Sequence, residues 1–385
     1  MKVPSLDLTQ QYTIINKEVS AIVQEVLASG RYIGGSIVDE FEQQFANYIS
    51  VSDCVSCNSG TDALFLALRA VNIGPGDEVI TTPFTFFATA EVISAVGAKP
   101  VFVDVDPQTL NLDLEQLEAA INNDTRAILP VHIFGQPVDM TRLMAIARSH
   151  NLVVIEDCAQ ATGAEWAGQK VGCLGDIGCF SFFPTKNLGA FGDGGAVTTN
   201  NPAIASQVRI LKNHGQSAKY YYEQIGINSR LDTMQAAILL VKLHYLDSWN
   251  QQRRILAERY NQFLSGINDI IPPQELAGGK CVWNQYTIRF NNQKLEEKVN
   301  SDFSSSWRDW ISIKLQKKGI GSTIYYPTPL HLQPVYKSLG YQVGQLPVVE
   351  QACRQVLSLP MFPELLTEQQ DQVIYALKDC LQELY

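Results

Sequence analysis

Short apolar runs alternate with helical stretches from residue 53 to residue 157, and this alternation limits the possible folds more than any other feature of the chain. The apolar runs are rich in β-branched residues and read DCVSC, DEVITT, KPVFVDV, TRAILPV and NLVVIED. The segments between them have helical character and read ALFLALRAV, FFATAEVISAV, LEQLEAAI and MTRLMAIARSH. Strands that are apolar nearly throughout are buried on both faces, so the pattern predicts an α/β fold with a mostly parallel sheet covered by helices.

The segments on either side of this alternation follow other patterns. The first dozen residues look extended and lead to a predicted helix over residues 13–28, and helical spacing resumes over residues 38–49. Long helical structure is predicted from Arg230 to about Phe263. Further on, NQYTIRF indicates a strand, and WRDWISIKLQKKGI indicates a helix that ends at Gly319.

The length of 385 residues exceeds the size at which a single core usually stops growing, so we predict two domains. The first contains the N-terminal arm and the large domain, over residues 1–249, and the second is a smaller α/β domain over residues 250–385. The polar stretch 291–306 is predicted to be a solvated insertion without a catalytic role.

The charge balance and the apolar pattern exclude several classes of function. With 29 basic and 39 acidic residues the net charge is −10, which disfavours binding to nucleic acid. No apolar run approaches the roughly 20 residues that span a bilayer, and the N-terminus lacks the apolar core of a signal peptide. We therefore expect a cytoplasmic protein with no membrane partner.

The eight cysteines are scattered, and they are predicted to be buried thiols. Cys54 and Cys57 form a C-x-x-C pair, but both lie in the strand-like run DCVSC, where their side chains would leave opposite faces. No second closely spaced pair completes a zinc site. We therefore predict no metal site.

Lys186 stands between an apolar run and a glycine-rich turn, in the sequence SFFPTKNLGAFGDGG. Pro184 cannot donate to a sheet ladder, so the strand that ends in Ser181 to Phe183 must turn there, with the lysine just beyond its edge. An amine in such a partly dry place has a lowered pKa and is a candidate for a covalent nucleophile. The alternative is a solvated surface lysine.

Two further motifs follow predicted strands, at the edge where such sheets bind ligands. NSGTDAL opens a helix, so the backbone N–H groups of Gly60 and Thr61 are available to a phosphate; an ordinary N-cap formed by Ser59 or Thr61 is the alternative. IEDCAQATGA places Asp157 at the end of the NLVV strand, where a buried carboxylate needs a partner such as a protonated pyridine nitrogen. A structural or helix-capping aspartate is the alternative.

Taken together, five motifs resemble those of a known family. NSGTDAL, TPFTFFATA, EDCAQATGA, SFFPTKNLGAFGDGG and GINSRLDTMQAA are similar to the motif set of the pyridoxal-phosphate-dependent nucleotide-sugar aminotransferases, the DegT family. The similarity extends from the arm to at least Asp247 and resumes in NQYTIRF and IYYPTPLHLQPVY. It implies the PLP-dependent transferase fold type I, as in the aspartate aminotransferases, and a homodimer with shared active sites.

The resemblance also implies roles for individual residues. Lys186 would form an aldimine with pyridoxal 5′-phosphate and later move a proton, and Asp157 would keep the pyridine nitrogen protonated. The other implied cofactor contacts are, for the ring, Phe86 and Gln160, and, for the phosphate, Gly60, Thr61, Ser181 and, from the partner subunit, Asn228. Without the resemblance, Phe86 would be equally well explained as core packing and Asn228 as a turn residue.

Contacts with the substrate are less defined. By the resemblance, the segment IYYPTPLHLQPVY places Tyr325, Tyr326 and His331 near the sugar-nucleotide pocket, and His132 ends a strand on the ligand side. Arg230 is a candidate for binding an acidic group of the donor or the sugar. Each histidine could equally be structural, and Arg230 could hold the subunit interface.

The resemblance finally distinguishes between reactions. Relatives that remove a sugar hydroxyl have a histidine at the position of Lys186, so transamination is expected, with L-glutamate as donor and pyridoxamine phosphate as the intermediate form of the cofactor. The run KNLGAFGDGG is similar to the branch acting on 3-keto sugars. The runs SCNSGTDAL, KNHGQ and NSRLDTMQAAILL resemble enzymes that aminate UDP-linked 3-oxo-N-acetylglucosaminuronate. A dTDP-linked substrate, a 4-keto sugar and a non-catalytic regulator of the same fold remain alternatives.

Overall fold

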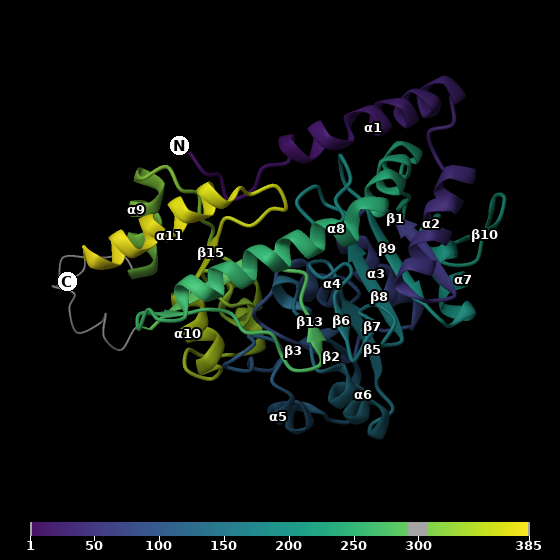
Figure 1. The fold of residues 1–385 in the computed structure, drawn as a ribbon. Coiled ribbons are helices and arrows are strands. Elements are labelled where there is room, and N and C mark those ends of the chain that lie inside the picture. Colours follow the sequence, from purple (N-terminus) through teal and green to yellow (C-terminus); the bar gives the residue numbers. More distant parts are fainter. Residues whose placement is uncertain (1, 292–306, 384–385) are drawn as a thin grey trace.

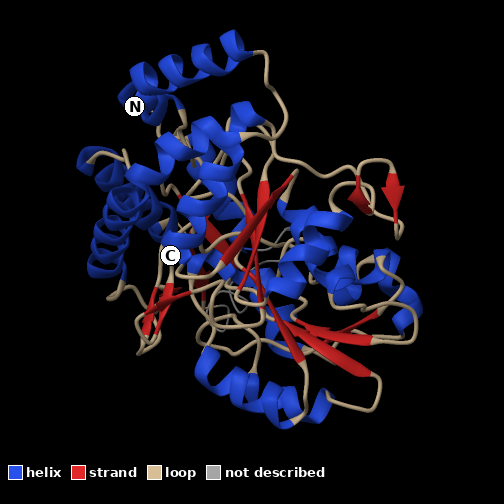
Figure 2. Ribbon diagram, turned by 90° about the vertical axis from the view of Figure 1, so that its right-hand side faces the viewer, coloured by secondary structure: helices blue, strands red, loops and turns tan. Residues whose placement is uncertain are grey.

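A seven-stranded sheet forms the centre of the protein in a computed structural model that describes residues 2–291 and 307–383 (Figures 1 and 2). The strand order is β1-β9-β8-β5-β4-β2-β3, and only β9 runs antiparallel to its neighbours. The predicted mostly parallel sheet is therefore confirmed. The strands are β1 (Asp53–Cys57), β2 (Glu78–Thr81), β3 (Lys99–Phe102), β4 (Thr125–Leu129), β5 (Val153–Asp157), β8 (Ile177–Ser181) and β9 (Gly195–Thr199).

Helices cover both faces of this sheet, because its strands carry apolar side chains on both sides. Cys54 packs into the cluster that contains α2 and α8, whereas Cys57 packs into the cluster that contains α3 and α7. The two thiols therefore leave opposite faces of β1, as predicted. The covering helices are α2 (Ser36–Ile49), α3 (Gly60–Ala70), α4 (Ala88–Ala95), α5 (Leu114–Leu117), α6 (Met140–Ser149), α7 (Pro202–Leu211) and α8 (Thr233–Leu264).

A second, smaller sheet has its own apolar core, in which Tyr260, Tyr286 and Phe362 are fully buried. The sheet contains β12 (Ile270–Ile271), β14 (Tyr286–Phe290) and β15 (Val356–Leu359). The accompanying helices are α9 (Trp307–Lys317), α10 (Pro347–Gln355) and α11 (Thr367–Gln382). The strand predicted in NQYTIRF is β14, and the helix predicted to end at Gly319 ends two residues earlier.

The predicted domain division at residue 250 falls inside α8, which continues through it without a break (Figure 1). Trp249 packs with α1, whereas Leu256 packs into the core of the second sheet. The division therefore stays a prediction. Residues 292–306 of the predicted polar insertion lie outside the described residues.

The N-terminal segment joins both parts of the molecule. Val3 pairs with Ile320 and is buried in the second core, and α1 (Thr9–Ser29) then packs on α8. The helix begins four residues before the predicted start because the Asp7 carboxylate accepts hydrogen bonds from the backbone N–H and the hydroxyl of Thr9. Among the described residues, no helix combines the length and the apolar character that crossing a membrane requires.

Two small β elements complete the described fold. A three-stranded sheet contains β6 (Glu165–Trp166), β7 (Gln169–Lys170) and β13 (Gly279–Lys280). A hairpin of β10 (Gln216–Ala218) and β11 (Tyr221–Tyr222) projects away from the central sheet (Figures 1 and 2).

Candidate active site

A cavity of about 410 Å³ opens at the carboxyl ends of the central strands. β5 ends there at Asp157 and β8 at Ser181, and the turn after β8 brings Lys186 to the same space. Parallel strands deliver the loops after them to a common edge, which explains why motifs far apart in the sequence meet. The residues predicted from sequence that line this cavity are Gly60, Thr61, Phe86, Asp157, Gln160, Ser181, Lys186 and Tyr325.

Lys186 is held by a tight turn after β8. Its backbone N–H donates to the carbonyl of Phe183, 2.9 Å away. Gly189 allows the close approach, because a Cβ atom there would lie 2.3 Å from the carbonyl oxygen of Pro184. The side chain is only partly exposed, and burial lowers the pKa of its amine, against the opposing effect of the Asp157 charge. The environment thus makes the neutral, nucleophilic amine easier to form than it is for a solvated lysine.

Asp157 is 4% exposed, and its two oxygens accept different hydrogen bonds. The Thr89 hydroxyl donates to Oδ2 at 2.8 Å, and the Ala159 N–H donates to Oδ1 at 3.1 Å. Burial raises the pKa of this carboxyl, while these hydrogen bonds and the Lys186 charge oppose the rise. The carboxylate therefore lacks full compensation for its burial, and a cationic ligand group in the cavity would supply it.

The start of α3 has the form of an anion cradle. Ser59 caps the helix by accepting a hydrogen bond from the Asp62 N–H at 3.1 Å, so the N-cap alternative is correct for Ser59. Gly60 and Thr61 follow at the cavity wall, where first-turn N–H groups attract negative charge. A Cβ at Gly60 would lie 2.6 Å from the Ser181 Cβ, so the glycine keeps open the space between the helix and the serine hydroxyl.

Replacing Gly60 with alanine is expected to narrow this cradle and weaken the binding of a phosphate-bearing ligand. Overpacking of this kind costs about 1–3 kcal/mol, which corresponds to roughly a tenfold loss of affinity or more. Titration of the cofactor-free protein with pyridoxal phosphate, followed by absorbance, measures the change. Gly266→Ala is the matched control, because a Cβ there meets no atom within 4 Å. Equal affinities for both variants would contradict the assignment.

Aromatic and amide side chains cover the remaining walls of the cavity. Phe86 is 60% exposed, so it is not a core residue and can cover a ligand ring. Gln160 accepts a hydrogen bond from the Phe134 N–H at 2.6 Å and donates to the Tyr326 hydroxyl at 3.1 Å. Tyr326 also lines the cavity, beside Tyr325, as the resemblance implied. Other lining residues were not predicted from the sequence, although TPFTFFATA contains one of them; they include Thr89, Thr185 and Gln285.

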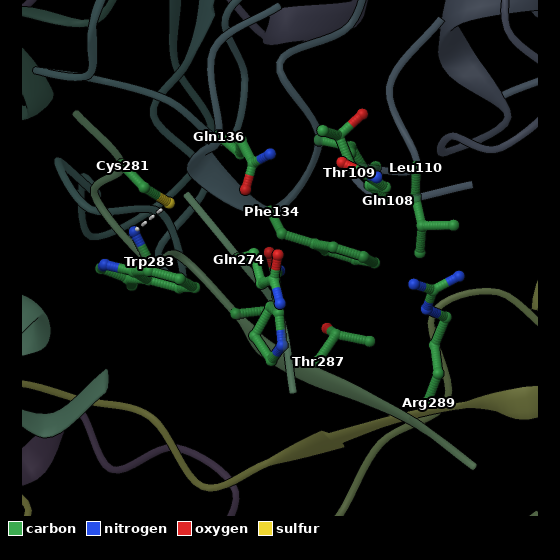
Figure 3. A pocket seen from close by; sticks show the side chains of 13 residues that line it. Gln108, Thr109, Leu110, Phe134, Gln136, Gln274, Cys281, Trp283, Thr287 and Arg289 are labelled. Carbon is green, nitrogen blue, oxygen red and sulfur yellow. Dashed lines mark hydrogen bonds between the residues drawn. The ribbon is translucent and has the colours of Figure 1, made fainter. Parts of the chain in front are cut away.

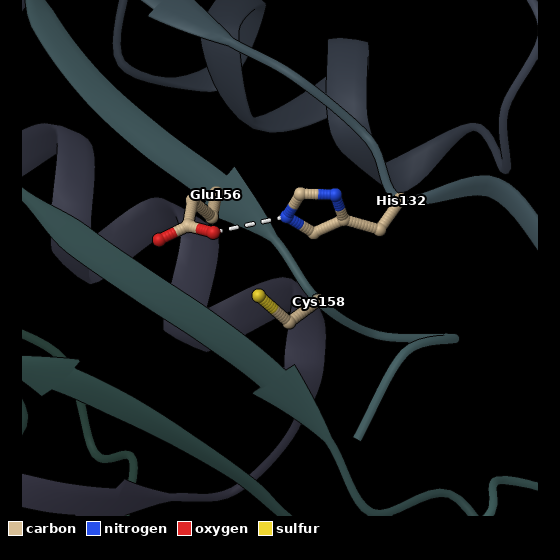
Figure 4. A group of neighbouring side chains, drawn as sticks. All are labelled: His132, Glu156 and Cys158. Atoms are coloured by element: carbon tan, nitrogen blue, oxygen red, sulfur yellow. Dashed lines mark hydrogen bonds and ion pairs between the residues drawn. The ribbon is translucent and has the colours of Figure 1, made fainter. Parts of the chain in front are cut away.

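His132 does not line the cavity, so the predicted substrate contact is wrong. Its ring points toward Glu156 instead (Figure 4). The ring is fully buried, and its Nδ1 accepts a hydrogen bond from the Val138 N–H at 3.1 Å. Nε2 therefore carries the proton and donates to Glu156, 3.0 Å away. Cys158 lies close to His132 and Glu156, so the three side chains could be taken for a metal site. Both ring nitrogens of His132 are already engaged in hydrogen bonds, which leaves no lone pair for a metal ion.

His331 is likewise a structural residue instead of the predicted substrate contact. It is 1% exposed and does not line the cavity, and its Nε2 lies 3.3 Å from Glu350. Burial lowers the pKa of His331, against the opposing effect of the Glu350 carboxylate. The neighbouring Tyr325 does line the cavity, as predicted.

Asn228 and Arg230 lie outside the cavity of their own chain. Asn228 forms an isolated β-bridge with Asn213, and the Arg230 guanidinium donates to the Asn213 side-chain oxygen at 3.3 Å. Asn228 is thus a bridge residue, and the alternative of a turn residue does not describe it. Its predicted role concerns a partner subunit, so it stays a prediction, as does that of Arg230.

A second cavity lies between the loop after β4 and the strand β14 (Figure 3), and Gln285 lines both cavities. Its volume is about 20 Å³, which is room for a single water molecule and not for a substrate. The Gln136 amide nitrogen on its wall is buried without a hydrogen-bond partner. This space therefore fits a bridging water better than a ligand group.

The main cavity fits pyridoxal phosphate on the features described above. The cradle between α3 and Ser181 suits the phosphate, Asp157 suits a protonated ring nitrogen, and Lys186 offers an amine of lowered pKa. Three features of the cofactor thus have complementary residues in one cavity.

Comparison with known proteins agrees with this fit. Residues 13–378 match the DegT/DnrJ/EryC1/StrS aminotransferase family. The chain is 45% identical to the UDP-N-acetyl-3-dehydro-α-D-glucosamine 3-aminotransferase of Acidithiobacillus ferrooxidans, over 95% of both chains. It is 41% identical to the UDP-2-acetamido-2-deoxy-3-oxo-D-glucuronate aminotransferase of Pseudomonas aeruginosa, over 94% of this chain and 96% of the relative. A protein of Geobacillus stearothermophilus, named pleiotropic regulatory protein, is 49% identical over 97% of both chains.

Solved structures agree as well. DesV of Streptomyces venezuelae, in complex with a ketimine intermediate, superposes with a TM-score of 0.92 at 42% identity over 98% of both chains. NtdA of Bacillus subtilis, with bound pyridoxamine phosphate, has a TM-score of 0.89 at 32% identity and covers 99% of this chain and 85% of its own. The PLP-dependent transferase fold type I, the pyridoxal phosphate cofactor and the transaminase activity expected from the motifs are thereby confirmed. Because the match extends over nearly the whole length, the chain belongs to the DegT/DnrJ/EryC1/StrS family of sugar-nucleotide aminotransferases.

Proposed function

We propose that the protein moves an amino group from L-glutamate to the 3-keto group of a nucleotide-linked sugar, with Lys186 as the covalent anchor of the cofactor. The observation that carries the proposal is the meeting of Lys186 and Asp157 at one cavity, each with its pKa moved from the ordinary value by burial. A non-catalytic regulator would need neither residue in this arrangement. The relative named as a regulatory protein therefore does not change the proposal.

The residues have distinct tasks in this reaction. Bound pyridoxal phosphate supplies an electron sink for the carbon that loses a proton. The Lys186 amine, with its lowered pKa, accepts that proton and returns it to the neighbouring position. Asp157 holds a proton on the ring nitrogen, and the residues of the cradle fix the phosphate. Phe86, on the cavity wall, would shield one side of the bound ring from water.

The sequence KNLGAFGDGG after Lys186 supports the 3-keto position, since the 4-keto branches tend to carry a threonine-glycine-glutamate type of run there. The printed names of two relatives refer to 3-oxo or 3-dehydro sugars linked to UDP. Other relatives are named as transaminases of dTDP-linked 3-amino sugars. The nucleotide of the substrate is thus UDP or dTDP, and a 4-keto sugar is the alternative.

A homodimer with shared sites is part of the proposal. Large apolar side chains remain exposed around the cavity, at Phe86 and Phe183 on its wall and at Phe191 and Tyr12 nearby. Exposed apolar groups that gather in one region favour coverage by another protein surface. A second copy would cover them and bring Asn228 to the phosphate.

The position of amination is expected to be C3 when the enzyme receives L-glutamate and a panel of UDP- and dTDP-linked 3-keto and 4-keto sugars. NMR of the products locates the new nitrogen, and 2-oxoglutarate reports use of the donor. Reduction with borohydride, followed by peptide mass spectrometry, should place the cofactor on Lys186. Amination at C4 alone would contradict the 3-keto assignment, and a colourless enzyme without transfer would contradict the whole proposal.

A further inference from the structure

Lys242 is a buried amine that the proposed reaction does not use. It lies on α8 and is 2% exposed. Its ammonium donates a hydrogen bond to the carbonyl oxygen of Gly189, in the turn that follows Lys186. The rings of Phe191 and Trp249 lie 5.2 and 5.9 Å from the ammonium, so its surroundings are largely apolar. Burial lowers its pKa to about 8, although the Glu364 charge opposes the change.

Two further residues of α8 hold the same turn. The Gln235 side-chain oxygen accepts a hydrogen bond from the Phe191 N–H at 2.8 Å. The Asn250 side-chain oxygen accepts one from the Asn187 amide at 2.6 Å. Gln235, Lys242 and Asn250 are seven and eight positions apart, which is about two helical turns each time, so they project from one face.

The turn needs such external support. It contains four glycines between residues 189 and 195, and glycine backbones have wide conformational freedom. Its contacts with α8 fall on every second residue, at 187, 189 and 191. The Lys186 side chain is long and flexible, so the place of its amine depends on the place of its backbone. A displacement of 1 Å can slow a reaction by about 10²-fold.

We propose that Lys242, with Gln235, is a positioning residue for Lys186: the two side chains hold the glycine-rich turn against α8 and so place the reactive amine in the cavity. This inference rests on the proposed role of Lys186. It also explains why a charged residue is buried at this position. Burial of a charge is costly, so an apolar residue would be the better choice if Lys242 only filled space.

The test compares Lys242→Met and Gln235→Ala with Lys170→Met. Lys170 is a fitting control because its ammonium also lies over an aromatic ring, 4.6 Å from that of Tyr48, and does not contact the turn. Pyridoxal phosphate is added to cofactor-free protein, and the growth of the visible absorbance gives the rate of attachment. Visible circular dichroism of the loaded protein reports the orientation of the cofactor.

Attachment is expected to be about tenfold slower in both α8 variants, with altered visible circular dichroism, while Lys170→Met behaves as wild type. Melting temperatures of the cofactor-free proteins should differ by only a few degrees. Attachment at the wild-type rate with an unchanged spectrum in both variants would overturn the inference and leave the proposed function intact. If Lys242→Met does not fold, Gln235→Ala, at a half-buried position, decides alone. A wild-type protein that does not bind pyridoxal phosphate at Lys186 would overturn the proposed function itself.

Discussion

Replacing Lys186 with alanine is expected to reduce nitrogen transfer by on the order of 10⁴-fold or more, because one residue supplies both the covalent anchor and the proton carrier. The turnover number is measured with L-glutamate and the keto sugar that the wild type accepts. Lys186→Arg should be inactive as well, since a guanidinium stays protonated at every accessible pH. The lysine control is Lys170→Ala, which should retain full activity.

Retained transfer in Lys186→Ala would contradict the assignment of the lysine.

The same variant also tests whether the active site is shared between two subunits. Lys186→Ala mixed with Asn228→Ala should regain part of the activity, because a mixed dimer would contain one site with both residues intact. No recovery, although mixed dimers form, would contradict the predicted contribution of Asn228 from the partner subunit.

Replacing Asp157 with asparagine is expected to have the second largest effect, a fall in turnover of roughly 10²–10³-fold. Asparagine keeps the shape and can still accept a hydrogen bond from the Ala159 N–H, but it carries no charge to hold a proton on the ring nitrogen. The cofactor should still attach to Lys186, so the visible absorbance should persist while turnover falls. Asp139→Asn, at the N-cap of α6, is the control, because either residue caps a helix well.

The stability of the cofactor-free protein should respond to Asp157→Asn in the opposite direction. Burial raises the pKa of Asp157 above its ordinary value of 3.8, so the folded protein binds its proton more tightly than the unfolded chain does. The aspartate therefore costs stability increasingly as the pH rises from the ordinary pKa of 3.8 to the raised folded pKa, and this cost vanishes as the pH falls below the ordinary pKa. Thermal unfolding near pH 7 should show the asparagine variant at least as stable as wild type, with the difference shrinking toward pH 4. A clear loss of stability near pH 7 would contradict the raised pKa.

Local patterns were sufficient for much of the fold. The five apolar runs became β1 to β5 because near-continuous apolar character is a property of each strand by itself. Lys186, Asp157 and the start of α3 were found because each follows a strand directly, and the carboxyl ends of parallel strands meet. The antiparallel direction of β9 and its place between β1 and β8 did not follow from the pattern, since pairing joins segments distant in sequence.

The directions of the two histidine side chains could not be predicted from the sequence. His132 and His331 stand in motifs beside the cavity, yet their rings face Glu156 and Glu350, which are contributed by other segments. The direction of a side chain depends on its partners, and those partners are chosen only when the chain folds.

Amino-acid order alone thus indicated the first five strands, the long helices and the candidates for the reactive amine and its acidic counterpart, because these depend on neighbours along the chain. Which side chains face the cavity, and which side chains support the loops around it, was decided only by the folded molecule. The support of the Lys186 turn by α8 belongs to the second group, since Gln235, Lys242 and Asn250 reach it from a helix that begins more than forty residues later. Such contacts arise from long-range packing, which no local pattern encodes.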